Sequence, residues 1–107
     1  MRKDAQLIHA YCAGMFGENP DIESSINGSA KSEHRFMAYL IFHRIFHTLS
    51  LKDVAYSFGK SDHTTIINGT KKALELVRTD LSYAKKLYSA ETHLRAFFKK
   101  YKGGKND

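Results

Sequence analysis

The sequence has little of what marks secreted or membrane-spanning chains. Cys12 is the only cysteine among 107 residues, so no internal disulfide can form, which fits a reducing cytoplasm. The longest nearly apolar stretch, residues 36–45, is too short to cross a bilayer and contains His43 and Arg44. No apolar run near Met1 resembles a signal peptide. We therefore expect a cytoplasmic protein that does not insert into a membrane.

Patterns typical of catalysis and of nucleotide or metal binding are also missing. The sequence has no G-x-x-x-x-G-K-[ST] loop, so we expect no bound nucleotide. His43 and His47 have a spacing that can hold zinc, but no glutamate lies between them and no third ligand is evident. Cys12 lies on an apolar helix face, and no Ser/His/Asp or Cys/His grouping can be argued from spacing. The expectation is a protein that is not an enzyme and holds no metal or cofactor.

The chain is basic, and its positive charge is unevenly placed. Its formal net charge is +6. Residues 1–70 hold seven Lys/Arg and seven Asp/Glu, whereas residues 71–107 hold ten and four. Such a balance favours a polyanionic partner, nucleic acid first and an anionic membrane surface second. The alternative is a solvated helical face followed by a basic tail.

Apolar residues recur at helical spacing along most of the chain, and no alternating β pattern of useful length occurs. The predicted fold is therefore all-α, a single compact bundle of five or six helices over residues 1–101, with 102–107 as a flexible basic tail. The stretch 32–47 is apolar on most sides, which places it in the middle of the core. The predicted helices cover residues 5–16, 20–26, 32–47, 50–58, 61–78 and 79–101.

The two C-terminal helices are expected to bury regular apolar stripes. The stripe of the helix over 61–78 would consist of Ile67, Thr70, Leu74 and Val77. The inward residues of the last helix would be Leu81, Ala84, Leu87, Leu94 and Phe98.

Residues 50–78 have the local signals of a helix-turn-helix. Ser50 and Asp53 form a capping box at the start of the short helix. Gly59 stands where a helix end favours a left-handed residue, and a polar cap at Ser61 or Asp62 starts the longer helix. In a DNA-binding helix-turn-helix, the N-terminal end of the second helix enters the major groove.

The residue types at the start of that second helix suit base recognition. Asp62 can accept from a cytosine amino group, His63 can donate to or accept from a base edge, and two threonines offer hydroxyl or methyl groups. In the structural alternative, Asp62 is only an N-cap and the threonines are ordinary surface residues. One and two turns along, Asn68, Lys71 and Lys72 could contact phosphates. On a helical wheel, the face opposite the expected buried stripe holds Thr65, Asn68 and Lys72.

The stretch from Ser50 to Ile67, with Asp62-His63-Thr64-Thr65 after Phe58-Gly59, resembles the signature of the C-terminal DNA-binding domain of DnaA, the bacterial replication initiator. The resemblance covers residues 5–100 and is strongest over 49–72. It implies a Trp-repressor-like helical fold that binds double-stranded DNA at a short asymmetric box. The residues implied to read bases are Asp62, His63, Thr64 and Thr65. The residues expected near phosphates are Ser50, Lys52, Lys60, Ser61, Asn68, Lys71 and Lys72.

The sequence departs from the family pattern at two places. In the family, an arginine-bearing loop before the long apolar helix enters the minor groove. Here that region contains Lys31 and Arg35 as candidates, and a gapless match puts His34 and Phe36 at the arginine positions. The usual Gly-Gly-Arg before Asp-His is Gly59-Lys60-Ser61, so the arginine is missing and Lys60 stands in its neighbourhood.

The expected function is sequence-specific DNA binding in replication initiation or its regulation, with one monomer per DNA site and a location at the nucleoid. Family members have an ATPase module before this domain, for which this chain has no room. We therefore expect a free-standing module, such as a phage or mobile-element protein, or a fragment of a longer protein. Two alternatives remain, a ligand-controlled dimeric repressor of the Trp-repressor type and a basic helical protein-interaction module.

Overall fold

The computed structural model describes residues 2–17 and 33–106, which form five α-helices and contain no strand. The Cα radius of gyration is 13.3 Å, close to the roughly 13 Å expected for a compact domain of this length. The predicted all-α class is thus confirmed, while the helix predicted over 20–26 lies outside the described residues. The helices are α1 (Lys3–Met15), α2 (Glu33–Ile45), α3 (Leu51–Ser57), α4 (Thr64–Thr79) and α5 (Leu81–Asn106).

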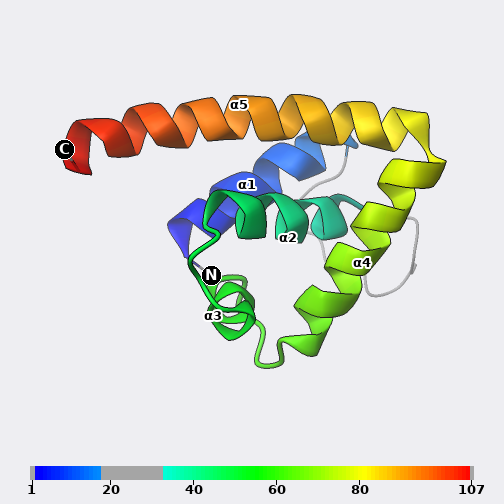
Figure 1. Cartoon of the computed structure of the whole chain (residues 1–107), viewed down its shortest axis with the longest axis horizontal. Coiled ribbons are helices and arrows are strands. Elements are labelled where there is room, and N and C mark those ends of the chain that lie inside the picture. The colour runs from blue at the N-terminus through cyan, green and yellow to red at the C-terminus, as the bar shows by residue number, and fades with distance from the viewer. Residues whose placement is uncertain (1, 18–32, 107) are drawn as a thin grey trace.

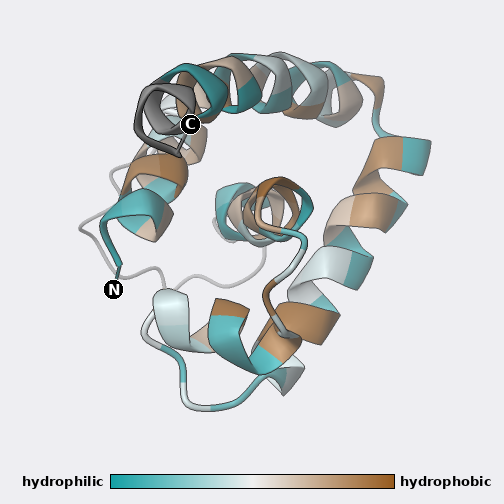
Figure 2. Ribbon diagram, turned by 60° about the vertical axis from the view of Figure 1, so that its left-hand side comes forward, coloured by the Kyte–Doolittle hydropathy of each residue, from teal (hydrophilic) through white to brown (hydrophobic). Residues whose placement is uncertain are grey.

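The apolar helix α2 lies at the centre of the bundle, as its sequence predicts. It packs against α1, α3, α4 and α5, and Figure 2 shows it almost end-on with the other helices around it. All residues from Met37 to Phe42 are at most 5% exposed. The Phe58 ring meets the rings of Tyr39 and Phe42 edge-on, with centroids 5.0 and 5.2 Å apart. This aromatic packing fixes the end of α3 against α2.

Polar contacts fix α5 to both ends of α2. At the start of α2, the Tyr83 hydroxyl donates to the Glu33 carbonyl oxygen at 3.0 Å. At its end, Arg44 Nη1 donates to Glu91 Oε1 at 2.8 Å, and the other oxygen of Glu91 accepts from Arg95. The long helix α5 therefore runs along one side of the molecule, with α3 on the opposite side (Figure 1).

The buried side of α4 is not the predicted stripe. Its buried residues are Ile66, Gly69 and Ala73, whereas Leu74 is 45% exposed. The reason is the close approach of α4 to α2: a β-carbon on Gly69 would lie 2.5 Å from Cδ2 of Tyr39. Gly69 and Ala73 therefore face the core with Ile66, and of the predicted stripe Val77 is only partly buried against it and Leu74 lies at the surface.

The sequence predicts the inner face of α5 correctly in its middle but not at its start. Leu87, Leu94 and Phe98 are buried, but Leu81 is 72% exposed. Asp80 separates α4 from α5, and its Oδ1 accepts from the Tyr83 N–H at 3.2 Å. The helix therefore begins at Leu81, in a register that turns this side chain to solvent and buries Tyr83 instead.

The C-terminal bound of α5 also differs from the prediction. The helix continues to Asn106, past the predicted end at residue 101 and through the residues expected to form a tail. Each glycine in a helix costs about 1 kcal/mol relative to alanine in backbone entropy but keeps its N–H, so Gly103 and Gly104 make the helix less favourable there without removing a backbone hydrogen bond as proline would.

Candidate nucleic-acid interface

Helix α3 is short and is held at both ends. Ser50 Oγ accepts from the Asp53 N–H at 3.1 Å, which confirms the predicted N-cap. The Ser57 hydroxyl donates back to the Asp53 carbonyl oxygen at 2.8 Å. Val54 and Ala55 are buried against the core. The α3 backbone is thereby fixed, although only seven residues make up the helix.

Gly59 ends α3 in the way the sequence predicts. Its φ is 75°, in the left-handed region that glycine adopts at no steric cost. The Gly59 N–H donates to the Tyr56 carbonyl oxygen at 2.9 Å, and the Lys60 N–H donates to that of Ala55 at 2.8 Å. These two bonds form a Schellman motif, which satisfies the last carbonyl groups of α3 and turns the chain toward α4.

Asp62 caps the first turn of α4. Its Oδ1 accepts from the Thr64 N–H at 2.9 Å, and its carbonyl oxygen accepts from the Thr65 N–H at 3.3 Å. The bond from the Thr64 N–H, with a smaller effect of the Thr64 hydroxyl, holds the pKa of this carboxyl below its ordinary value. The structural role considered for Asp62 is therefore present, while the side chain as a whole is 66% exposed.

The four residues predicted to read bases form one continuous exposed group at the start of α4. Asp62, His63, Thr64 and Thr65 are all exposed. The side chains of Asp62 and His63 are 66% and 52% exposed, and Asp62 Oδ1 lies 3.9 Å from His63 Nδ1. The group thus presents carboxylate, imidazole and hydroxyl functions to solvent at a helix end, in the chemical mixture that base edges can pair with.

The residues predicted to contact phosphates are exposed around this group. Ser50 and Lys52 lie at the start of α3, Lys60 and Ser61 lie in the connection to α4, and three more lie along α4. On α4 they lie outside the face that buries Ile66, Gly69 and Ala73. The predicted residues there are Asn68, Lys71 and Lys72, and Glu75 and Arg78 are exposed farther along the helix.

The residues weighed for minor-groove contact are distributed differently. His34 is only 4% exposed, and its ring lies 5.1 Å from the ring of His9 and 6.5 Å from that of Phe16. His34 is therefore a core residue and not a groove contact. Arg35 lies half-buried in the first turn of α2, and Lys31 lies outside the described residues.

The basic residues of α5 lie away from the group at the start of α4. Lys85, Arg95 and Lys99 are exposed on α5, which runs along the side of the molecule opposite α3 (Figure 1). The excess of positive charge in residues 71–107 thus belongs in large part to a different surface. The cations close to the α3–α4 connection are those of α3, of the connection itself and of α4.

Two residues that matter at this surface were missed in the sequence. Gly69 permits the contact between α4 and α2, and the only signal was a glycine inside a helical pattern. Arg2 lies beside the α3–α4 connection because its N–H donates to the Ser57 carbonyl oxygen at 2.8 Å. No sequence pattern relates two residues that far apart in the chain.

Neither a metal centre nor a membrane span is present in the part of the chain that the structure describes. No group of three or more His, Cys, Asp or Glu side chains is arranged there to hold a metal ion. None of the described helices has the length and apolar character needed to cross a bilayer.

Comparison with known proteins found no matching family model, no matching curated protein and no matching solved structure.

Proposed function

We propose that this chain is a DNA-binding protein, not an enzyme, and that α3 and α4 act as a helix-turn-helix. In this proposal the start of α4 enters the major groove of double-stranded DNA, and Asp62, His63, Thr64 and Thr65 discriminate between bases. Lysines of α3, the connection and α4 supply sequence-independent attraction to the phosphates.

The observation that carries the proposal is the exposed group at the start of α4. Four consecutive polar residues project there from a helix end that the Asp62 cap and the Gly59 turn hold in place. A surface that reads bases must be rigid and polar at once, because each hydrogen bond to a base edge depends on position. Exposed lysines flank the group on both sides, at Lys60 and Lys72.

We further propose replication initiation, or its regulation, as the process served. This part of the proposal rests on the resemblance of residues 49–72 to the DnaA C-terminal domain. A module of this kind, as part of a phage or a mobile element, would regulate an initiator by occupying the boxes that the initiator recognises. One monomer would bind one asymmetric box, with Arg35 and Lys31 as candidates for the adjacent minor groove.

Selection from a random pool tests the proposal directly. The purified chain is incubated with random duplex DNA at near-physiological salt, and the retained fraction is sequenced. We expect one enriched asymmetric motif, of the size that a single recognition helix and a flanking contact can cover. Similarity of that motif to initiator boxes would support the role in replication. Binding without enrichment that disappears as salt rises would contradict sequence-specific recognition.

One observation favours a second candidate, an interaction through α5. Leu81 and Tyr88 are 72% and 76% exposed on this helix, and Lys85 lies between them. Such a face suits either a dimeric repressor of the Trp-repressor type or a basic module that binds an acidic protein. Light scattering distinguishes these two alternatives. A wild-type chain with the molar mass of a dimer, and a Leu81→Ser, Tyr88→Ser double variant with that of a monomer, would favour the repressor.

A further inference from the structure

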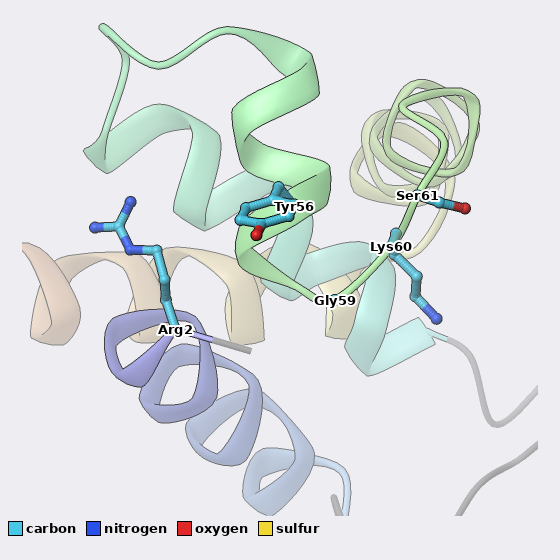
Figure 3. A pocket seen from close by; sticks show the side chains of 5 residues that line it. All are labelled: Arg2, Tyr56, Gly59, Lys60 and Ser61. Atoms are coloured by element: carbon cyan, nitrogen blue, oxygen red, sulfur yellow. The ribbon is translucent and has the colours of Figure 1, made fainter.

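A hollow of about 730 Å³ opens beside the connection between α3 and α4. It is lined by the residue before α1, by the end of α3 and by the connection (Figure 3). Two of its five described lining residues are cationic, two bear hydroxyl groups and one is glycine. They are Arg2, Tyr56, Gly59, Lys60 and Ser61.

Arg2 is held in place at one side of the hollow. Its guanidinium carbon lies 5.9 Å from the ring centroids of both Phe42 and Phe46, and Nη2 donates to Asp4 Oδ2 at 2.7 Å. The side chain is still 47% exposed. A guanidinium has five N–H donors, and the contact with Asp4 uses only part of them. Arg2 can therefore donate to an anion while it remains packed on the aromatic rings.

The other side of the hollow is formed by the turn that ends α3. A β-carbon on Gly59 would have no atom within 4 Å, so the backbone there is open to a ligand. Lys60 and Ser61 follow directly, and Tyr56 is 80% exposed at the end of α3. Figure 3 shows the Lys60 and Ser61 side chains on the opposite side of the hollow from Arg2, with the Tyr56 ring between them.

We propose that this hollow binds a phosphate group of the DNA backbone and thereby adds Arg2 and Tyr56 to the interface. A phosphodiester is an anion with several acceptor oxygens, which suits the Arg2 guanidinium and the Tyr56 hydroxyl, while the Lys60 and Ser61 side chains point away from Arg2 at the far side of the hollow (Figure 3). The hollow is wide and adjoins the start of α4, so a phosphate can reach it while still attached to a duplex. This inference rests on the proposed function, because the duplex must first contact α4.

A charge-matched pair of variants tests the proposal. Arg2→Ala removes one of the two cations that line the hollow, and Lys3→Ala removes an exposed neighbouring cation that does not line it. We expect Arg2→Ala to weaken binding to specific and random duplexes alike, by about tenfold, and to lower the salt dependence by about one unit. Lys3→Ala should change both much less.

The contacted phosphate can be located on the DNA. Duplexes are prepared with a neutral methylphosphonate at one backbone position at a time. At one position the methylphosphonate should weaken binding of the wild-type chain clearly more than binding of Arg2→Ala, since part of the contact that it removes is already lost in that variant. Tyr56→Phe keeps the exposed ring and removes the hydroxyl. Its affinity should fall about threefold for the unmodified duplex and much less for the duplex with the methylphosphonate at that position.

The outcomes separate this proposal from the one on which it rests. If the wild-type chain binds no duplex, the proposed function is wrong. If it binds a duplex but Arg2→Ala and Lys3→Ala behave alike, or every methylphosphonate weakens Arg2→Ala as much as the wild-type chain, the hollow is not a phosphate site. Thermal unfolding of each variant identifies any loss that follows from misfolding, in which case the Tyr56→Phe result decides.

Discussion

Gly69 of α4 lies directly against the ring of Tyr39 of α2. A β-carbon at Gly69 would be 2.5 Å from Tyr39 Cδ2 and 3.3 Å from a ring carbon of Phe36. Tyr39 cannot move away easily, because it is 4% exposed and its ring packs edge-on against Phe58. The position of α4, and with it the position of Asp62 to Thr65 at its start, therefore depends on the absence of one side chain.

Replacing Gly69 with alanine should destabilise the protein. Overpacking a core contact costs roughly 1–3 kcal/mol, while exchanging glycine for alanine inside a helix recovers about 1 kcal/mol. We expect a net loss of about 1 kcal/mol, which corresponds to a fall in Tm of about 4–8 °C for a domain of this size. Thermal unfolding followed by circular dichroism measures it.

Gly14→Ala is the matched control. Gly14 lies in α1, is exposed, and would have no atom within 4 Å of an added β-carbon. Only the helix-propensity term applies there, so Tm should stay the same or rise slightly. Equal changes in Tm for the two variants would show that the contact with Tyr39 does not limit the position of α4.

Asp62→Asn separates the cap from base recognition. An asparagine side chain retains the oxygen that accepts from the Thr64 N–H, so the helix start should be preserved. Its amide group would replace the other carboxylate oxygen by a donor. We therefore expect a loss of about tenfold in the preference for one base pair, with little change for random DNA. Parallel selections with both proteins measure this, and an unchanged motif would assign Asp62 to capping alone.

The same contact predicts how Asp62 responds to pH. The Thr64 N–H favours the charged form and lowers the carboxyl pKa in the folded protein. Any stability that this cap contributes is therefore present above the pKa of the unfolded chain and is lost as pH falls through the lowered folded value. The difference in Tm between the wild-type chain and Asp62→Ala should shrink only in acid, and a difference that changed between pH 6 and 8 would contradict this cause.

Local features of the fold could be predicted from the sequence, whereas features set by helix packing could not. The Ser50 cap and the left-handed Gly59 depend on residues within one turn, and both are confirmed. The exposure of Leu74 and Leu81 was missed because apolar periodicity does not reveal where one helix crosses another. Arg2 is held beside the α3–α4 connection by its bond to Ser57 and by packing on Phe42 and Phe46, which no local pattern encodes.

Cys12 should be unreactive in the folded protein. Its side chain is fully buried in α1, and burial raises the pKa of the thiol to about 12. Thiolate is the reactive form, so a thiol reagent at pH 8 should label the native chain only as fast as the core opens. Denaturant should make labelling rapid. Equally fast labelling in both conditions would mean that Cys12 is accessible.

The ionisation of Cys12 has a consequence for stability. Because the folded pKa is raised, the thiol contributes stability that is fully present below the pKa of the unfolded chain and is lost as pH rises above it. The free energy of unfolding should therefore fall between pH 8 and 10 by more in the wild-type chain than in Cys12→Ala. Parallel slopes for the two proteins would be inconsistent with a raised pKa.

Lys72 and Lys99 test which of the basic surfaces faces DNA. Both side chains are exposed, but Lys72 lies on α4 near the proposed reading group and Lys99 lies on α5, which runs along the opposite side. Removing a cation that contacts a phosphate lowers the slope of log affinity against log salt by about one unit, alike for all sequences. Lys72→Ala should show that change and Lys99→Ala should not. The reverse result would place the duplex on α5 and would mean that the cations of that helix contact the phosphates.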